Sequence, residues 1–322
     1  MKTARRLQKK AVFFTFVAII LLAALVFSFS IYARYRMRTR GLVIETRVNT
    51  MNSFMKDLEK DIIRGSFISS HRAILAMAEY VSSNGVYIDD IGARFEEVFL
   101  NGTMNSSLQT LMYDTTFNDW ISRMQYQGGR INLEIDFDIK SVVINQSDPW
   151  NVDIYLDTNI YVNDATDIAA WNITRTIKTV VPIEGFEDPV YAMNTDGKVL
   201  NIVNKTPFTD FVIANDTSNL QQHNENSYYF AWSTAPSFLM RLEGNLSSSP
   251  YGIESMVNFQ KLIDHGIETE ERSVVDHIYW SNKSVTSYHI DNMPSWFMMD
   301  NENNPSEGMT HLQLYEVEGL IQ

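Results

Sequence analysis

The sequence contains no cysteine among its 322 residues. Disulfide bonds, thiolate zinc sites, iron–sulfur clusters and cysteine nucleophiles are therefore excluded together. Glycine and proline are also sparse, at 14 and 8 residues, and this composition excludes collagen-like and low-complexity chains. What the sequence does have is 45% apolar residues, over a length sufficient for one or two domains with a sizeable buried core.

Acidic residues are missing from the first 40 positions, which hold nine Lys and Arg residues. Because the whole chain has a net charge of −13, the remaining residues carry −22. Nucleic-acid binding requires a cationic surface that releases counterions from the phosphates. The acidic body therefore argues against a nucleic-acid partner.

An uncharged run of 22 residues, 11–32, follows the first basic cluster. As a helix it is about 33 Å long, enough to cross a hydrocarbon core of about 30 Å. Bulky residues end the run, where a signal peptide would have small residues and a cleavage site. We therefore predict a basic cytoplasmic tail over 1–10 and a retained single-pass transmembrane helix over 11–32, with the lipid bilayer as a partner.

The orientation of this helix is indicated by glycosylation sequons more than by charge. Five positive residues precede the span and four follow it, so the positive-inside rule gives almost no preference for either orientation of the helix. Eight asparagines stand in Asn-x-Ser/Thr, which is the acceptor motif of secreted segments. Together with the acidic body, they predict a cytoplasmic N-terminus and an extracytoplasmic, glycosylated body. The predicted sites are Asn101, Asn105, Asn145, Asn172, Asn204, Asn215, Asn245 and Asn282.

Residues 33–84 are predicted to form an amphipathic stalk helix that ends at the Ser82-Ser83-Asn84-Gly85 stop. Apolar residues recur there in steps of four and three, the spacing of a heptad stripe. The stripe fits either a coiled-coil or filament seam, or packing on the chain's own body. We favour packing within the chain, because a free stripe would leave a contiguous apolar patch exposed. The stripe residues are Ile44, Val48, Met51, Met55, Leu58 and Ile62.

Residues 85–322 are predicted to form an acidic ectodomain, so that the whole chain belongs to the α+β class. Two short helices over 88–127, broken at Asn101-Gly102, precede three runs with a period of two, and the short links between these runs permit only antiparallel pairing in a β-meander. A second domain after about 205 is permitted but not required. Additional elements are expected as a hairpin between 190–193 and 199–203, a helix over 252–263, and strands over 274–280 and 287–290.

The N-terminal plan resembles archaeal type IV pilin-like and single-pass cell-envelope proteins. The segments that carry the likeness are QKKAVFFTFVAIILLAALVF and the motif GFEDP at 185–189. The resemblance implies that a prepilin peptidase cuts near Lys10 or Ala11 and that the apolar helix packs in a filament core. Many pilins have Glu five residues after the cut, where this chain has Thr15 and Phe16, and four arginines follow the span. These departures favour an unprocessed anchor over a processed pilin-like subunit, and both interpretations stay open.

Sequence motifs of enzymes are absent: the chain has no G-x-S-x-G elbow, H-E-x-x-H motif, P-loop or G-x-G-x-x-G. Three Asp–His pairs could supply a base with its orienting carboxylate, but we expect them to be adjacent polar residues on surface turns. The pairs are Asp264-His265, Asp276-His277 and His289-Ile290-Asp291.

One row of acidic residues, Glu134, Asp136 and Asp138, lies on a single face of a predicted strand. A divalent cation could bind between such carboxylates, but a solvated strand face places its charges in the same way. The sequence therefore predicts no catalytic, cofactor-binding or metal-ligating residue, no cofactor and no enzymatic activity.

Two functions follow from these observations. The first is a membrane-anchored cell-surface structural or interaction protein, of which a pilin-like subunit or accessory protein is one form. Its partners would be other envelope or pilus proteins, or further copies of the chain. The second is a membrane-tethered hydrolase or carbohydrate-binding module that uses the late aromatic residues. A pocket that joins an Asp–His pair to Trp232 or Trp280 would favour the second function, although most of these aromatics are expected to be buried.

Overall fold

The computed structural model of the chain describes residues 2–322, and the side chains of all of these except 2–12 and 40. The basic tail and the predicted cleavage position near Lys10 and Ala11 lie outside the described side chains. Helix accounts for 44% of the structure and strand for 23%, with a long apolar N-terminal helix and small antiparallel sheets. This mixture agrees with the predicted α+β class.

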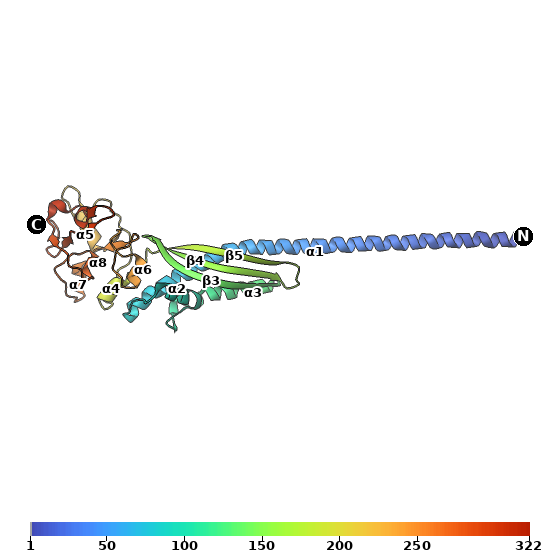
Figure 1. The fold of residues 1–322 in the computed structure, drawn as a ribbon, viewed down its shortest axis with the longest axis horizontal. Helices are drawn as coiled ribbons and strands as arrows, with labels where there is room; N and C mark the ends of the chain where they lie inside the picture. The colour runs from blue at the N-terminus through green and yellow to red at the C-terminus, as the bar shows by residue number, and fades with distance from the viewer. Residues whose placement is uncertain (1) are drawn as a thin grey trace. The chain divides into compact units, whose positions relative to one another are not determined.

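The chain divides into two compact units, each described here by itself. Unit 1 is Met1–Lys60 with Asn163–Ala170, and unit 2 is Asp61–Val162 with Trp171–Gln322. The helix α1 (Lys2–Asn84) contributes to both units, and neither Gly41 nor Gly65 interrupts it (Figure 1).

Unit 1 exposes the large apolar side chains of α1. Phe14, Leu22 and Phe29 are each at least 68% exposed. The tip between two strands returns to the same helix, where Asp164 forms an ion pair with Arg47 and accepts the backbone N–H of Thr166 at 2.8 Å. Unit 1 is therefore a single helix with a short hairpin tip attached to it.

The heptad stripe of α1 is buried at one end and open at the other. Its four residues from Met51 to Ile62 are at most 4% exposed in the single chain, whereas Ile44 is 48% exposed and Val48 is half-buried. Packing within the chain is thus confirmed for these four residues and wrong for Ile44.

Helices of unit 2 end and begin where the sequence signals them. Helix α1 ends at Asn84, before Gly85 with φ +64°, a left-handed conformation that favours glycine. Asp90 caps α2 by accepting the N–H of Ala93 at 3.0 Å. The predicted break at Asn101-Gly102 is confirmed, although the second helix begins only at Phe117. The elements of this part are α2 (Ile91–Asn101), β1 (Thr103–Met104), β2 (Ser107–Leu108), η1 (Thr110–Met112) and α3 (Phe117–Arg130).

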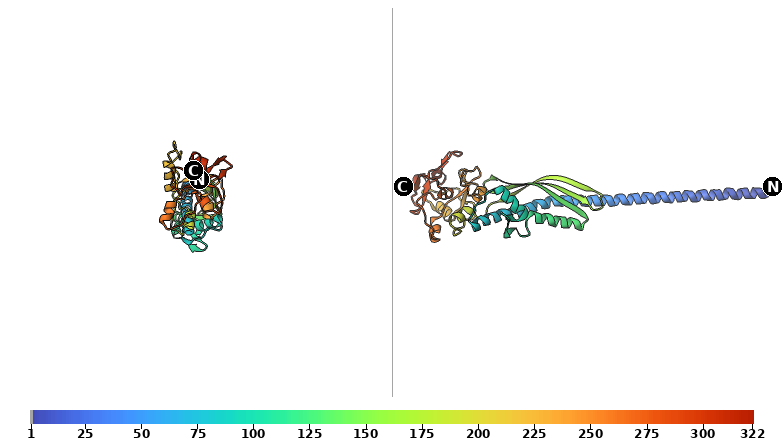
Figure 2. Two further views of the ribbon diagram at one scale, coloured as in Figure 1. Left: turned by 90° about the vertical axis from the view of Figure 1, so that its left-hand side faces the viewer. Right: turned by 60° about the horizontal axis from the view of Figure 1, so that its bottom comes forward.

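Three long strands follow, and Figure 2 (right) shows them as green to yellow-green arrows. They pair in the order β3-β4-β5, and tight links join the neighbours, so the sheet is the predicted antiparallel meander. The alternation is as expected, because Leu133 and Ile135 are buried while Glu134 and Asp136 are exposed. Helix α3 lies along β3. The strands are β3 (Leu133–Asp148), β4 (Asn151–Asp164) and β5 (Ala170–Pro182).

From residue 183 onward every helix and strand is eight residues long or shorter. Antiparallel pairs form between β6 and β7, β8 and β9, and β10 and β11. The elements are α4 (Pro189–Asn194), α5 (Ser218–Glu225), β6 (Tyr229–Ala231), α6 (Phe238–Leu242), β7 (Ile253–Ser255), α7 (Phe259–Asp264), α8 (Asp276–Tyr279), β8 (Ser287–His289), β9 (Met298–Asp300), β10 (Asn303–Asn304), β11 (Met309–Thr310), α9 (His311–Leu314) and η2 (Glu318–Leu320).

Two predictions for this part are wrong, and a third is only partly correct. Residues 190–193 form helix α4, not a hairpin strand, because Asp188 caps the turn and Pro189 occupies its first position. The helix predicted over 252–263 is confirmed only from Phe259 onward, as α7, whereas residues 253–255 form strand β7. Gly252 permits this close packing, since a Cβ there would lie 2.1 Å from the carbonyl oxygen of Ala235. Residues 276–279 form helix α8, not a strand, and every side chain from 274 to 279 is buried, so no outward face exists.

Aromatic side chains fill the core of this short-element region. Tyr191, Phe211, Phe259, Phe297 and Tyr315 are all at most 2% exposed and belong to one hydrophobic cluster. Among the late aromatics of the sequence analysis, burial is confirmed for Tyr229, Trp232, Tyr279 and Phe297, whereas Tyr228, Phe230, Trp280 and Trp296 are half-buried.

Candidate functional site

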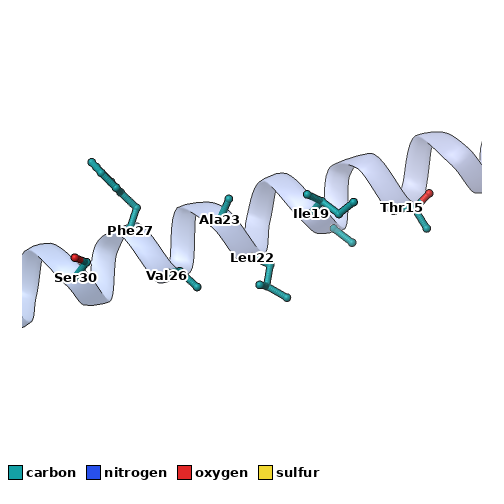
Figure 3. A pocket seen from close by; sticks show the side chains of 8 residues that line it. Thr15, Ile19, Leu22, Ala23, Val26, Phe27 and Ser30 are labelled. Atoms are coloured by element: carbon teal, nitrogen blue, oxygen red, sulfur yellow. The ribbon is translucent and has the colours of Figure 1, made fainter.

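A shallow apolar hollow lies along the surface of the N-terminal helix (Figure 3). Its walls come from one helix only, and Leu22 and Phe27 point to opposite sides, so it is a helix surface and not an enclosed cavity. Lipid tails or a neighbouring helix contact surfaces of this kind. Within the described residues, this helix is long and apolar enough to cross a membrane. The lining residues are Thr15, Ala18, Ile19, Leu22, Ala23, Val26, Phe27 and Ser30.

All eight sequon asparagines are exposed. In contrast, Asn201, Asn224 and Asn304, which are not in sequons, are buried. Asn304 belongs to the triplet Asn-Pro-Ser, in which the proline prevents glycosylation. The positions of the sequons thus permit attached glycans at every predicted site.

A buried ionic network lies in unit 2. Arg241 is the only Lys or Arg that is buried among the described side chains. Its Nη1 atom lies 2.7 Å from Asp188 Oδ2 and 2.9 Å from Asp276 Oδ2. Tyr229 donates its hydroxyl to Asp188, and Ser255 donates to Asp276, each at 2.7 Å. Burial alone would raise the pKa of Asp276, but the Arg241 guanidinium holds it well below its usual range.

Beside this network, Glu254, His277 and His311 bring three potential metal ligands together. The side chains are 0%, 4% and 0% exposed. Their ligand atoms all lie within 4.8 Å of one another. Glu254 Oε2 is 3.3 Å from His311 Nε2 and 3.8 Å from His277 Nδ1, and none of these three atoms has a hydrogen-bond partner. Two imidazoles and one carboxylate form a ligand set typical of zinc and of non-haem iron.

The other atoms of these side chains are held by hydrogen bonds. His311 Nδ1 is 2.6 Å from Asp300 Oδ1, and Ser273 donates to Asp300 Oδ2 at 2.5 Å. Tyr315 donates its hydroxyl to Glu254 Oε1 at 2.8 Å. Burial would lower the pKa of His311, but the Glu254 and Asp300 carboxylates outweigh it and raise this pKa to about 10. Without a metal ion, His311 therefore carries a proton between two carboxylates.

Short elements with alternating side chains place the two clusters next to each other. Along β7, Glu254 faces the histidines, whereas Ser255 faces Asp276 of the Arg241 network, as expected for successive strand residues. At the start of α8, the Asp276 side chain faces Arg241, whereas the His277 side chain faces Glu254. The backbone N–H of His277 donates to Asp276 Oδ1 at 2.6 Å, which fixes the first turn.

The expectation that the Asp–His pairs lie on surface turns is wrong for Asp276-His277, which is buried. The surface position is confirmed for the pairs at 264–265 and 289–291, whose Asp and His side chains are exposed, although Asp264 ends helix α7 and His289 ends strand β8. His311 links the buried pair to Trp232, because their ring centroids lie 6.0 Å apart. This group lies in the protein interior and not in an open substrate pocket. Sequence reasoning missed Glu254, Asp300 and His311, since no local motif contains them.

The acidic row Glu134, Asp136 and Asp138 lies on the outer face of β3, as a solvated edge would. Asp138 forms an ion pair with Lys140 of the same strand. The row therefore behaves as an ordinary charged strand face.

A partly open cleft lies elsewhere in unit 2, lined by Trp296, His289, Glu270 and Glu271 with four further residues. One face of Trp296 is occupied, because the ring stacks on Phe259 at a centroid distance of 5.5 Å. The cleft joins a histidine of the pair at 289–291 to a tryptophan, but not to Trp232 or Trp280.

Comparisons with protein-family models, with curated proteins and with solved structures give no match for this chain.

Proposed function

We propose that the chain is a single-pass membrane protein that displays an acidic body on the cell surface, where it acts as a structural or interaction protein. The observation that carries this proposal is the exposure of large apolar side chains over 13–37 of a continuous helix. In water such a surface would aggregate, whereas a bilayer solvates it. Burial of the stripe residues begins at Met51, beyond the arginines that follow the span.

The outward orientation of the body is supported by the sequons. Their eight asparagines are all exposed, while Asn304, the asparagine of the blocked triplet, is buried. A glycan is bulky and polar, so it can be attached only at such exposed positions. Partners of the body would then be other envelope or pilus proteins, or further copies of the chain.

Protease accessibility tests the proposal with the full-length chain in its own cell. Added protease should remove the body from intact cells, and residues 1–32 should remain in the carbonate-washed membrane. A variant that lacks residues 11–32 serves as the control and should leave the membrane fraction. A body that is protected in intact cells and cleaved only after permeabilisation would contradict the orientation.

Mapping of the native N-terminus distinguishes the anchor from the pilin-like subunit. A peptide that begins before Lys10 supports the unprocessed anchor, which the arginines at 34, 36 and 38 favour. A mature N-terminus at Ala11 would instead support a processed subunit whose apolar helix packs with its neighbours.

A carbohydrate-binding module is the second candidate function, and the cleft at Trp296 favours it. Aromatic rings stack on sugar faces, and the adjacent Glu270 and Glu271 are acceptors for hydroxyl groups. Replacing Trp296 with Ala should abolish any glycan retention by the full-length protein on immobilised polysaccharides. Unchanged retention would exclude this cleft as the binding site.

A further inference from the structure

Three buried polar atoms without a hydrogen-bond partner converge on one point inside unit 2. Glu254 Oε2, His277 Nδ1 and His311 Nε2 are buried, lack hydrogen-bond partners and lie within 4.8 Å of one another. Buried polar atoms nearly always have a partner, so three orphans directed at the same space point to a ligand between them. Tetrahedral zinc with bonds of about 2.0–2.1 Å would hold its ligands about 3.3–3.4 Å apart. The 3.3 Å separation between His311 and Glu254 already has this value.

Neighbouring residues orient two of these ligands. Asp300 accepts from His311 Nδ1 at 2.6 Å, which directs the Nε2 lone pair toward the centre of the cluster. Tyr315 holds Glu254 through Oε1 and leaves Oε2 free. A carboxylate behind a ligating histidine and a donor behind a ligating carboxylate are the supports that metal sites use.

The charges of the surrounding interior favour a divalent cation. Four carboxylates are fully buried here, those of Asp188, Glu254, Asp276 and Asp300. Arg241 is the only permanently charged cation buried with them among the described side chains. Buried charge is costly unless it is balanced. A divalent ion bound beside these carboxylates would compensate two of their charges.

The elements that carry the ligands are short and have no covalent cross-link. The ligands come from β7, α8 and α9, which are only three to four residues long, and Asp300 ends the three-residue strand β9. Such short elements have few hydrogen bonds of their own, and the chain has no cysteine for disulfides.

We propose that Glu254, His277 and His311 bind one structural Zn²⁺ ion that joins β7, α8 and α9. Zinc suits a set of two imidazoles and one carboxylate, whereas calcium and magnesium prefer oxygen ligands alone. The ion is structural, because its three ligand side chains are at most 4% exposed and no substrate reaches them. This inference does not depend on the membrane orientation of the protein.

Metal analysis of the tag-free, full-length protein in detergent tests the proposal. After chelator treatment and return of Zn²⁺ alone, we expect about one zinc per chain and a rise of several degrees in the melting temperature of the body. Cobalt in place of zinc should give the visible absorption bands of a four-coordinate site with nitrogen and oxygen ligands. A wild-type protein that retains no zinc, and whose melting temperature zinc does not change, overturns the proposal.

Variants assign the ligands and remain informative even if one of them folds poorly. His277→Gln and Glu254→Gln should each lose the bound zinc and the zinc-dependent shift in melting temperature. Asp300→Asn should weaken zinc binding about 10–100-fold, as loss of a supporting carboxylate does. The matched control is His223→Gln, because His223 is equally buried but lies outside the cluster, and it should retain full zinc binding. Zinc that persists in both His277→Gln and Glu254→Gln would show that the ion binds elsewhere.

Discussion

The indole of Trp120 lies directly against the α1 backbone, and its Nε1 atom donates a hydrogen bond to Asp61 Oδ2 at 3.0 Å. The ring covers Gly65, one turn further along the helix, where an added Cβ would lie 2.6 Å from Trp120 Cδ1. Gly65 is therefore required by close packing and not by a bend, since the helix continues through it. The Trp120 indole also packs against Phe137 of β3 in an edge-to-face arrangement, with the ring centroids 5.3 Å apart.

Replacing Gly65 with Ala should destabilise the body, although Gly→Ala inside a helix normally stabilises by about 1 kcal/mol. The added methyl group must displace the Trp120 ring, and overpacking of this kind costs about 1–3 kcal/mol. The matched control is Gly41→Ala in the same helix, where nothing lies within 4 Å of the added Cβ. Chemical denaturation of both variants measures the difference. Equal or increased stability for Gly65→Ala would contradict the packing described here.

The regular part of the fold could be predicted from the sequence because its signals are local. The alternation of apolar and polar residues over 131–181 is sufficient to predict the meander, and Gly85 and Gly102 indicate where two helices end. The region after residue 183 could not be predicted in this way. Its elements are too short for a period to be recognised, and burial on every side removes the apolar–polar alternation.

The candidate metal site could not be predicted because it is assembled by tertiary contacts. Glu254, His277 and His311 come from three separate elements and share no motif with a known spacing. The sequence identifies Asp276-His277 as a possible base with its orienting carboxylate, but it predicts a position on the protein surface. Only the fold shows that the two residues point into adjacent buried clusters. The sequence-based prediction of no metal ligand remains open to the zinc measurements proposed above.

Substitution of Met51 or Leu58 by Asp should lower the stability of the monomeric protein. Both side chains are at most 2% exposed, so each change removes buried apolar contacts and introduces a buried charge. Loss of the contacts alone costs about 2–5 kcal/mol. Ile44→Asp, at 48% exposure, is the matched control and should leave the melting of the body unchanged. If instead the monomers melt normally and only oligomers are lost, the stripe is a seam between copies.

Replacing Arg241 with Met should destabilise the body strongly, by about 3–5 kcal/mol, because it leaves Asp188 and Asp276 buried without their counterion. The exposed pair of Arg123 with Asp114 provides the control, since its side chains are 49% and 77% exposed. Arg123→Met should change the free energy of unfolding by less than about 1 kcal/mol. Urea denaturation of the two variants compares the buried pair with the exposed one. Similar values for both would show that the buried network contributes little.

A second buried histidine gives the body a defined pH dependence. His223 is fully buried, with Nδ1 at 3.1 Å from the Thr206 hydroxyl and its ring among Phe211, Tyr228 and Tyr315. Among the described contacts of this ring, no charged group faces it. Burial therefore lowers the pKa of His223 to about 3, from an ordinary value of 6.5.

Between pH 6.5 and 3 the unfolded imidazole binds a proton that the folded one does not, so stability is complete above pH 6.5 and falls as the pH decreases through this window. This histidine alone should contribute a slope of about 1.4 kcal/mol per pH unit. His223→Gln should remove that slope while it keeps a polar partner for Thr206. The exposed His289→Gln is the control for loss of an imidazole and should leave the slope unchanged. Denaturation curves at pH 6, 5 and 4 measure the difference, and identical slopes for His223→Gln and the wild type would mean that His223 is protonated in the folded state.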